Sequence, residues 1–272
     1  MLKLILLIFP LICAGTDLKP WFGNDYEAEF RATILYQNYS SLATPDKNYK
    51  RNDNDTFSTL SAAYPFKRYS GEFEATAAHT KHQSCCWDNY RFTGRYKWFD
   101  DIRDQFSLVT SITIQEPMTR ALNDVSSFHH GHLEGEFCLS YGKKYGYPCS
   151  SDYIYRWWNV LGVGSADQGS LWYRAEGTWE CNIWDIHRFR VFGHILWGAG
   201  GNDLNPYDFH GYGSIRHRSA DVGVRYEYRI PGWGSLNFQY AHRVYASNFP
   251  QQTNLLMFQY YYPFGSQVHT NY

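Results

Sequence analysis

The most constraining feature of this sequence is an apolar residue at every second position, repeated along most of the chain. From Tyr26 to Tyr36 the even-numbered positions carry Tyr, Ala, Phe, Ala, Ile and Tyr, and the odd-numbered positions are mostly charged or polar. Successive side chains of a β-strand point to opposite faces, so this spacing predicts a strand with one apolar face. A helix would instead place its apolar residues three and four positions apart.

The alternation recurs often enough to predict twelve strands. Clear copies lie within 26–37, 72–77, 90–98, 106–114, 133–141, 171–179, 189–197, 222–228 and 236–240. Weaker copies lie within 57–66, 152–163 and 253–264. Such segments suit the ~9–11 residues that cross a bilayer as a tilted strand, whereas no stretch approaches the ~20 apolar residues of a spanning helix.

The predicted connections differ in length on the two sides of the sheet. On one side we expect long links at 40–56, 116–131 and 200–220, alternating with shorter ones at 81–88, 164–170 and 246–252. On the other side most turns are tight, notably around residues 184–186 and 231–234. Long loops outside and short turns inside are typical of outer-membrane barrels. The expected fold is therefore an all-β, antiparallel, up-and-down transmembrane β-barrel over residues 26–264. The residues expected to face lipid are Phe30, Ile34, Phe73, Ala77, Phe92, Leu108, Ile112 and Val224.

The first residues have the form of a secretory signal peptide. Lys3 precedes the apolar run Leu4–Ile12, and small residues near Gly15 favour cleavage after that position. We therefore expect a signal peptide at 1–15, a periplasmic lead at 16–25 and a C-terminal tail at 265–272.

Export into an oxidising compartment would allow the cysteines to form disulfides. Five of them follow the predicted signal peptide, and an odd number leaves at least one thiol without an internal partner. The sequence therefore predicts disulfide links to other envelope proteins. These residues are Cys85, Cys86, Cys138, Cys149 and Cys181.

The final strand carries aromatic or large apolar residues at alternate positions from Leu256 to Phe264. It resembles the terminal signal that bacterial outer-membrane barrels present to the barrel-insertion machinery, although residues 265–272 follow it. From Tyr26 to Phe264 the chain resembles such a barrel of the twelve-stranded size. The resemblance implies residence in the outer membrane, with its lipids and the insertion machinery as partners. Charge is nearly balanced, with 25 Lys+Arg against 26 Asp+Glu, which argues against a nucleic-acid partner.

Aromatic residues near the predicted periplasmic ends of the strands support the membrane interpretation. Aromatic side chains form girdles where a barrel meets the membrane interface. A secreted soluble β-sandwich that binds a ligand also alternates and remains an alternative. The residues expected near the periplasmic rim are Phe66, Phe73, Trp98, Phe106, Tyr141, Phe189, Tyr228 and Tyr262.

The polar face of the predicted strands carries charges of both signs, which we expect inside the barrel. Counting across two turns pairs Glu72 with Lys97, Glu74 with Arg95, Glu180 with Arg190, and Glu176 with His194. The function expected from such a lumen is a narrow channel for ions or small polar solutes, or a structural role in the envelope. The predicted lining residues are Glu27, Glu29, Arg31, Glu72, Glu74, Arg91, Arg95, Lys97, Glu134, Glu136, Arg174, Glu176, Glu180, Arg190, Arg225, Glu227 and Arg229.

A lipid-modifying hydrolase is the other alternative, because one outer-membrane phospholipase is a barrel of the same size. Such an enzyme needs a serine and a histidine at the membrane edge. His242 is predicted on the lipid face, and its nearest serines are Ser235 and Ser247. The sequence lacks G-x-S-x-G, H-E-x-x-H and Gly-rich phosphate-binding motifs, so we assign no catalytic residue.

Histidines and cysteines gather in two predicted outer loops. Imidazole and thiolate groups bind zinc or copper, but their spacing here provides no closed set of ligands. We therefore expect no metal and no cofactor. These residues are His79, His82, Cys85 and Cys86 in one loop, and His129, His130 and His132 in the next.

Overall fold

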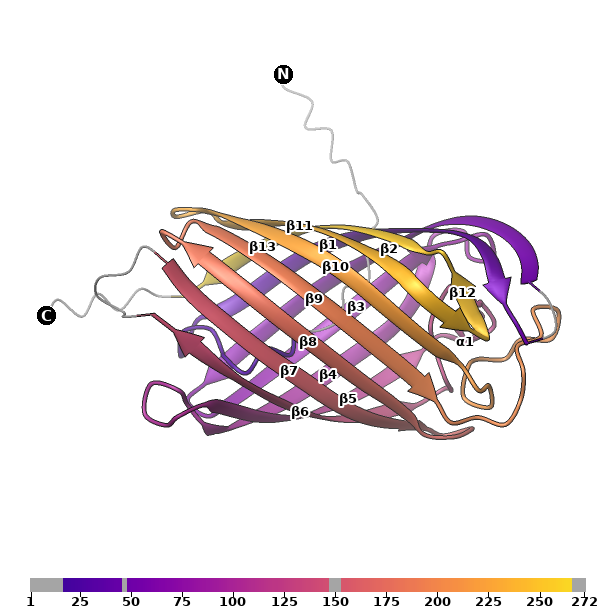
Figure 1. The fold of residues 1–272 in the computed structure, drawn as a ribbon, viewed down its shortest axis with the longest axis horizontal. Coiled ribbons are helices and arrows are strands. Elements are labelled where there is room, and N and C mark those ends of the chain that lie inside the picture. Colours follow the sequence, from indigo (N-terminus) through magenta and orange to yellow (C-terminus); the bar gives the residue numbers. More distant parts are fainter. Residues whose placement is uncertain (1–16, 46–47, 147–152, 266–272) are drawn as a thin grey trace, which may run out of the picture.

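The protein is a single antiparallel sheet closed into a barrel (Figure 1). The computed structural model describes residues 17–45, 48–146 and 153–265. The predicted signal peptide, Cys149 and most of the predicted tail lie outside the described residues. The elements are β1 (Ala28–Ala43), β2 (Asn48–Phe66), β3 (Tyr69–His79), β4 (Cys86–Phe99), β5 (Ser107–Pro117), α1 (Thr119–Leu122), β6 (Glu134–Tyr145), β7 (Tyr153–Ala166), β8 (Trp172–Ile183), β9 (His187–Gly198), β10 (Arg218–Ile230), β11 (Gly234–Ser247), β12 (Phe249–Gln251) and β13 (Asn254–Phe264).

The barrel closes because the first long strand pairs with the last. Ile34 of β1 lies opposite Ser58 of β2 on one side and opposite Phe258 of β13 on the other. Each of the remaining long strands pairs with its neighbours in chain order, except that β11 pairs with β13 across the short strand β12, which pairs with the end of β1. The prediction of twelve antiparallel transmembrane-length strands is confirmed.

The two ends of the barrel differ in their connections. One end, here called the turn end, carries short links such as residues 184–186, where Trp184 and Asp185 have positive φ angles of 53° and 54°. Positive φ at both central positions matches the twist of a tight hairpin. The other end, here called the loop end, carries the long links 118–133 and 199–217, as predicted.

The prediction of a long loop at 40–56 is wrong. Strand β1 continues to Ala43 and β2 begins at Asn48, so this hairpin projects beyond the barrel at the loop end (Figure 1). The register shifts between Tyr39 and Ser41, and the buried Tyr39 hydroxyl donates to the Asp53 carboxylate at 2.9 Å. This buried contact anchors residues whose polar sequence resembles a loop.

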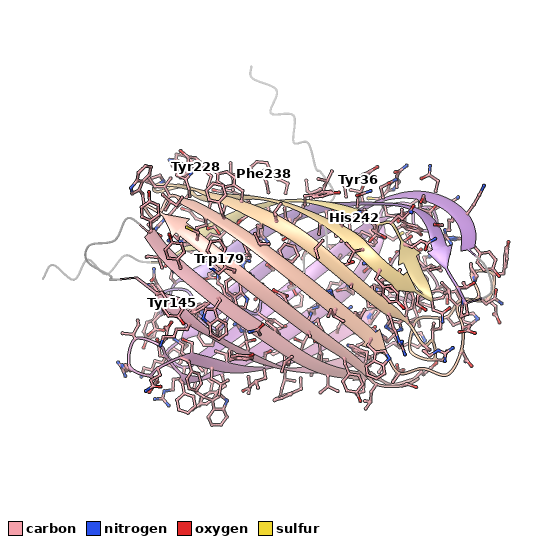
Figure 2. The ribbon with its side chains drawn as sticks, viewed as in Figure 1. Tyr36, Tyr145, Trp179, Tyr228, Phe238 and His242 are labelled. Atoms are coloured by element: carbon pink, nitrogen blue, oxygen red, sulfur yellow. The ribbon has the colours of Figure 1, made fainter. Side chains whose placement is uncertain are left out.

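The alternation separates the two faces of the wall as predicted. Phe73, Phe92 and Val224 are more than half exposed, whereas their neighbours Glu74 and Thr93 are buried. Large aromatic side chains stand outward near the turn end, as Figure 2 shows for Tyr145, Trp179 and Tyr228. Within the described residues, no helix is long and apolar enough to cross a bilayer. The other positions predicted to face lipid are exposed or half-buried: Phe30, Ile34, Ala77, Leu108 and Ile112.

Phe92→Arg tests this assignment of faces. Phe92 lies in the middle of β4 with 54% of its surface exposed, so the substitution places a guanidinium toward the lipid. An arginine near the bilayer midplane costs roughly 2–4 kcal/mol in such barrels. We expect a loss of this size in the urea-unfolding free energy of protein refolded in bilayers. Phe92→Leu is the matched control, and equal stability of the Arg and Leu variants would refute the assignment.

Candidate functional site

The inward face of β1–β4 carries two groups of ion pairs. Arg31 donates to Glu72 at 2.7 Å and to Glu29 at 2.8 Å, and its chain therefore bridges two carboxylates. On the neighbouring strands Arg91 lies 3.2 Å from Glu74. A buried charge is costly unless it is paired, so these contacts allow charged residues to point inward.

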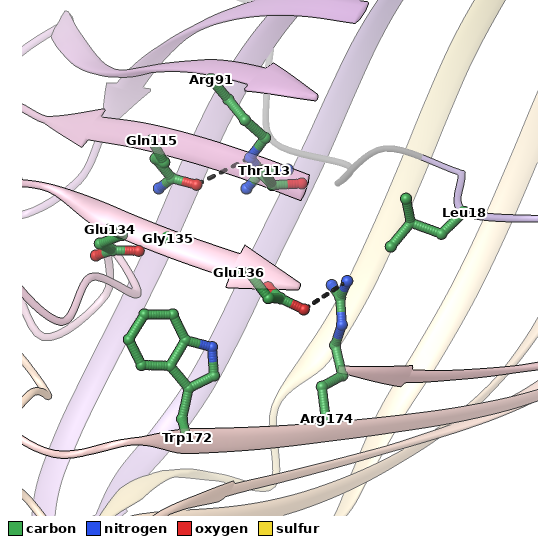
Figure 3. A pocket seen from close by; sticks show the side chains of 9 residues that line it. All are labelled: Leu18, Arg91, Thr113, Gln115, Glu134, Gly135, Glu136, Trp172 and Arg174. Atoms are coloured by element: carbon green, nitrogen blue, oxygen red, sulfur yellow. Dashed lines mark hydrogen bonds and ion pairs between the residues drawn. The ribbon is translucent and has the colours of Figure 1, made fainter. Parts of the chain in front are cut away.

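The opposite wall repeats this arrangement. Glu180 of β8 accepts from Arg190 of β9 at 2.9 Å and from Arg156 of β7 at 3.4 Å. Two further pairs join adjacent or nearly adjacent strands: Arg174 with Glu136 at 2.9 Å, drawn in Figure 3, and Arg188 with Glu227 at 2.9 Å. Charges of both signs therefore line the lumen around its circumference.

Half of the predicted cross-strand pairs are correct. Glu180 faces Arg190 and Glu176 faces His194, because the β8–β9 turn is as tight as expected. The pairs on β3 and β4 are wrong. Glu72 faces Thr93, and Glu74 faces Arg91.

The error on β3 and β4 comes from the position of their loop. The backbone N–H of Thr80 donates to the Gln83 carbonyl, the Thr80 hydroxyl accepts from the N–H of His82, and Cys85 takes a positive φ of 55°. These contacts centre the loop nearer the N-terminus than the predicted 81–88. A register shift between Thr76 and Ala77 offsets this difference by one residue.

The other predicted lining residues lie at different depths. Glu134 sits near the loop end and accepts from the backbone N–H of His130 at 2.5 Å. Glu176 accepts from Thr178, and Lys97 pairs with Asp100 at 3.0 Å. Glu27, Arg225 and Arg229 surround a cavity at the turn end. Of these, Arg229 is half-exposed and pairs with Asp185 in the β8–β9 turn.

The segment predicted as a periplasmic lead lies inside the barrel instead. We call residues Asp17–Asn24 the inner segment. Leu18 packs against Cys138, Trp158 and Val160, and the Trp21 ring stands edge-on to Trp158 at 5.7 Å. The alternation could not reveal this placement, because the segment forms no strand and Leu18 and Trp21 pack against residues far along the chain.

Polar contacts also hold the inner segment to the wall. Arg95 donates to the Lys19 carbonyl, and its guanidinium lies 4.8 Å from the centre of the Phe22 ring. The Trp21 indole donates to Asp101 at 3.1 Å. Arg95 is therefore a predicted lining residue whose partner is the inner segment rather than Glu74.

Cavities of very different size adjoin the inner segment. A chamber of about 1540 Å³ extends to the turn end and is lined by charged residues together with Trp21, Phe22 and Tyr261. A second cavity of about 40 Å³ lies between Leu18 and Trp172, with Arg91 and Arg174 on its walls (Figure 3).

The loop end is filled by a packed apolar core, here called the cap core. Rings dominate it: Phe128 contacts Tyr212 and Phe249 with ring centres 4.8 and 4.6 Å apart. The fully buried Tyr212 donates its hydroxyl to the Val125 carbonyl at 2.9 Å. The long loops thus fold over the lumen and close it. The buried members are Tyr39, Leu42, Val125, Trp172, Leu196, Leu204, Phe209, Tyr212, Ile215 and Phe249.

Three buried histidines lie in and beside the cap core. His129 lies 2.8 Å from Asp88, and His130 stacks on Trp172 at 3.8 Å. The Nε2 atoms of His130 and His217 are 3.4 Å apart. His129 and His130 lie in a loop at the loop end, as predicted, but both are buried because the loop turns inward. Across residues 17–45, 48–146 and 153–265, no group of three or more metal-ligating side chains is arranged to hold an ion.

These histidines titrate in opposite directions. Burial, together with the nearby His130, lowers the pKa of His217 to about 3. Burial also opposes the charged form of His129, but the carboxylates of Asp88 and Glu134 outweigh it and raise the pKa of His129. His217 is therefore kept neutral within the cap core, whereas the charged form of His129 is favoured.

The outward-facing His242 does not meet a serine. Its Nδ1 lies 3.0 Å from the Asn254 side-chain oxygen, which also accepts from the Tyr240 hydroxyl at 2.9 Å. Ser235 precedes His242 by an odd number of residues on β11 and is buried on the opposite face. This pair therefore does not supply the geometry that a hydrolase would need.

The neutral His217 predicts an acid-sensitive cap core. Its stabilising contribution is present above the ordinary histidine pKa of about 6.5 and is lost as pH falls toward its folded pKa of about 3. The contribution of His129 has the opposite sign: it is fully present below about 6.5. Acidification from pH 6.5 to 5 should therefore cost the cap core about 2 kcal/mol.

Hydrogen–deuterium exchange of residues 199–217, corrected for the intrinsic pH dependence, measures this change. We expect faster exchange at pH 5 than at pH 7 in the native protein and little difference in His217→Gln. His82→Gln, in an exposed loop, is the control and should behave as the native protein does. Acid sensitivity that survives His217→Gln would contradict this explanation.

No protein-family model matches the sequence, and no curated protein matches it. Solved structures with a similar architecture include an outer-membrane channel from Pseudomonas putida F1, at a TM-score of 0.65 and 8% identity, with 89% of this chain and 97% of that chain covered. The NanC porin is similar at a TM-score of 0.54 and 8% identity, with 85% and 97% covered. At such identities the likeness concerns the fold: a closed antiparallel β-barrel of the outer-membrane type.

Proposed function

We propose that this protein is a narrow outer-membrane channel for ions or small polar solutes, and that its described conformation is closed. The observation that carries the proposal is the chamber of about 1540 Å³, whose lining includes acidic and basic residues and which extends to the turn end. Short turns face the periplasm in outer-membrane barrels, so this chamber would open to the periplasm.

The size of the chamber supports transport over a purely structural role. The interior of an eight-stranded barrel is just filled by side chains, and twelve strands enclose more room. A wide cavity lined by charged residues is costly, because each charge needs an oppositely charged partner. A barrel that serves only as a support has no need of such a cavity. The ion pairs of the wall narrow the path, which favours small polar solutes over larger sugars.

Two separate parts of the chain block this path. The inner segment fills the middle of the lumen through Leu18 and Trp21, and the cap core fills the loop end. Conduction would require both to move. The inner segment is attached to the wall by a few side chains, so its release disturbs no strand pairing.

We also propose residence in the outer membrane after removal of residues 1–15. The outward belt of exposed apolar side chains, with aromatic residues near the turn end, supports the membrane location. The apolar run Leu4–Ile12 supports export, with cleavage after Gly15. Surrounding lipids and the barrel-insertion machinery would then be the partners of the chain.

Planar-bilayer recordings test the channel proposal. We expect brief, low-conductance openings of the native protein. Leu18→Ser combined with Trp21→Ala removes the apolar contacts of the inner segment and should raise the open fraction at least tenfold. Phe238→Ala, on the outer face, is the matched control and should leave conductance unchanged. Absence of conductance in the native protein, in the inner-segment variant and in a Phe128→Ala cap variant would refute the proposal.

Truncating one ion pair tests whether the wall sets the width of the path. Glu74→Ala with Arg91→Ala removes two long side chains of opposite charge, so no lone charge of this pair remains. We expect a higher unitary conductance with unchanged ion selectivity. Glu74→Ala alone should instead shift selectivity toward anions, and a double variant of unaltered conductance would place the narrowest point elsewhere.

The cysteines carry a separate prediction about partners. Cys85 and Cys86 lie at the loop end and are exposed and half-buried, whereas Cys138 is buried in the lumen between Glu136 and Arg174. The four cysteines of the described ranges form no disulfide with one another. Non-reducing gels of native envelopes should therefore show reducible species of higher mass, which Cys85→Ser/Cys86→Ser should remove and Cys138→Ser should not. A monomer band insensitive to reductant would exclude such links.

A further inference from the structure

One carboxylate in the lumen belongs to the inner segment rather than to the wall. The Oδ2 atom of Asp17 lies 3.1 Å from Nη1 of Arg190 on β9 and 3.9 Å from Nη1 of Arg225 on β10. Lys19 of the same segment approaches this oxygen at 3.8 Å. A single carboxylate therefore bridges two arginines on neighbouring strands.

The two arginines depend on Asp17 to different degrees. Arg190 keeps Glu180 as a second partner, through Nε at 3.3 Å and Nη2 at 2.9 Å. Arg225 otherwise donates to neutral oxygens, those of Asn237 at 3.3 Å and Gln259 at 2.5 Å. Within the described part of the chain, Asp17 is the carboxylate that lies at ion-pair distance from Arg225. Removing Asp17 therefore leaves Arg225 without a carboxylate at ion-pair distance.

The arrangement has the chemistry of a site for carboxylates. Guanidinium groups present fixed N–H donors that match a carboxylate, and such charge-assisted bonds are among the stronger ones in proteins. Asn237 and Gln259 hold the Arg225 side chain from the wall, so its position does not depend on the inner segment. Both Asp17 and Arg225 line the chamber that extends to the turn end. A solute entering from that end can reach them.

We propose that Arg190 and Arg225 form a binding site for the carboxylate group of a small solute, and that Asp17 occupies this site as an internal ligand when the lumen is closed. A solute carboxylate replaces Asp17 on the two arginines and so removes one of the attachments of the inner segment. The proposal extends the proposed function by naming the class of solute that favours opening, but the binding itself requires no conduction.

Binding of trifluoroacetate, followed by its ¹⁹F line width with the full-length protein in detergent, tests this proposal. Asp17→Asn empties the site without removing the inner segment, so we expect at least a fivefold larger protein-dependent broadening than with the native protein. Propionate should reverse the broadening. Asp17→Asn combined with Arg225→Gln should return it to the native level, because half of the site is then missing.

The matched control is Asp25→Asn. Asp25 belongs to the same part of the chain and lines the same chamber, but it accepts from the backbone N–H of Lys67 rather than from an arginine. It should broaden trifluoroacetate no more than the native protein does. The heat-dependent mobility shift of folded barrels on gels verifies that each variant is folded. Asp17→Asn combined with Arg225→Lys is a milder double variant. Its broadening should lie between that of Asp17→Asn and that of the native protein.

The outcomes separate this proposal from the channel proposal. Equal broadening by the native protein, Asp17→Asn and the double variant would overturn the carboxylate site whatever the bilayer recordings show. Selective broadening by Asp17→Asn in a protein that never conducts would uphold the site and refute the channel. A response to Asp25→Asn as large as that to Asp17→Asn would also overturn it, because it would reflect net charge alone.

Discussion

The structure depends above all on the backbone pairing of the first long strand with the last. In the hydrocarbon region no water is present to satisfy N–H and C=O groups, so a sheet can span a membrane only if it has no free edge. Pairing of β1 with β13 along residues 28–38 provides this closure. Every other feature follows from it: once the sheet is a cylinder, alternate side chains must point either to lipid or to a confined interior.

That confinement explains the charge pattern of the wall. Arginine and glutamate pointing inward cannot be left alone in a poorly hydrated space, so they are arranged across neighbouring strands as partners. Arg31 between Glu29 and Glu72, and Glu180 between Arg156 and Arg190, show the same solution on opposite walls. The inner segment adds its own carboxylate, Asp17, to this network. The interior is thus assembled from the wall and from a piece of chain that belongs to no strand.

The sequence alone was sufficient to predict the wall of the barrel, because a period of two is a local signal. It predicted the strand number, the face on which Phe92 lies and the opposition of Glu180 and Arg190. It failed where distant contacts decide the outcome. The polar residues after Tyr39 form a strand because Tyr39 binds Asp53 and Ser126, the latter 87 positions away. Likewise, the inner segment and the buried His129 and His217 are placed by partners that no local pattern identifies.

The small cavity between Leu18 and Trp172 has an electrical consequence. Its volume of about 40 Å³ holds only about three water molecules, given the space one water needs. An ion in transit would have to shed most of its hydration shell there, in a space lined by Leu18 and Trp172 together with side chains that are already paired, such as Glu136 and Arg174. Together with the cap core packed over the loop end, this leaves no wide hydrated route for a charge through the described part of the barrel. The resting barrel would therefore act as an electrical insulator while it is shut.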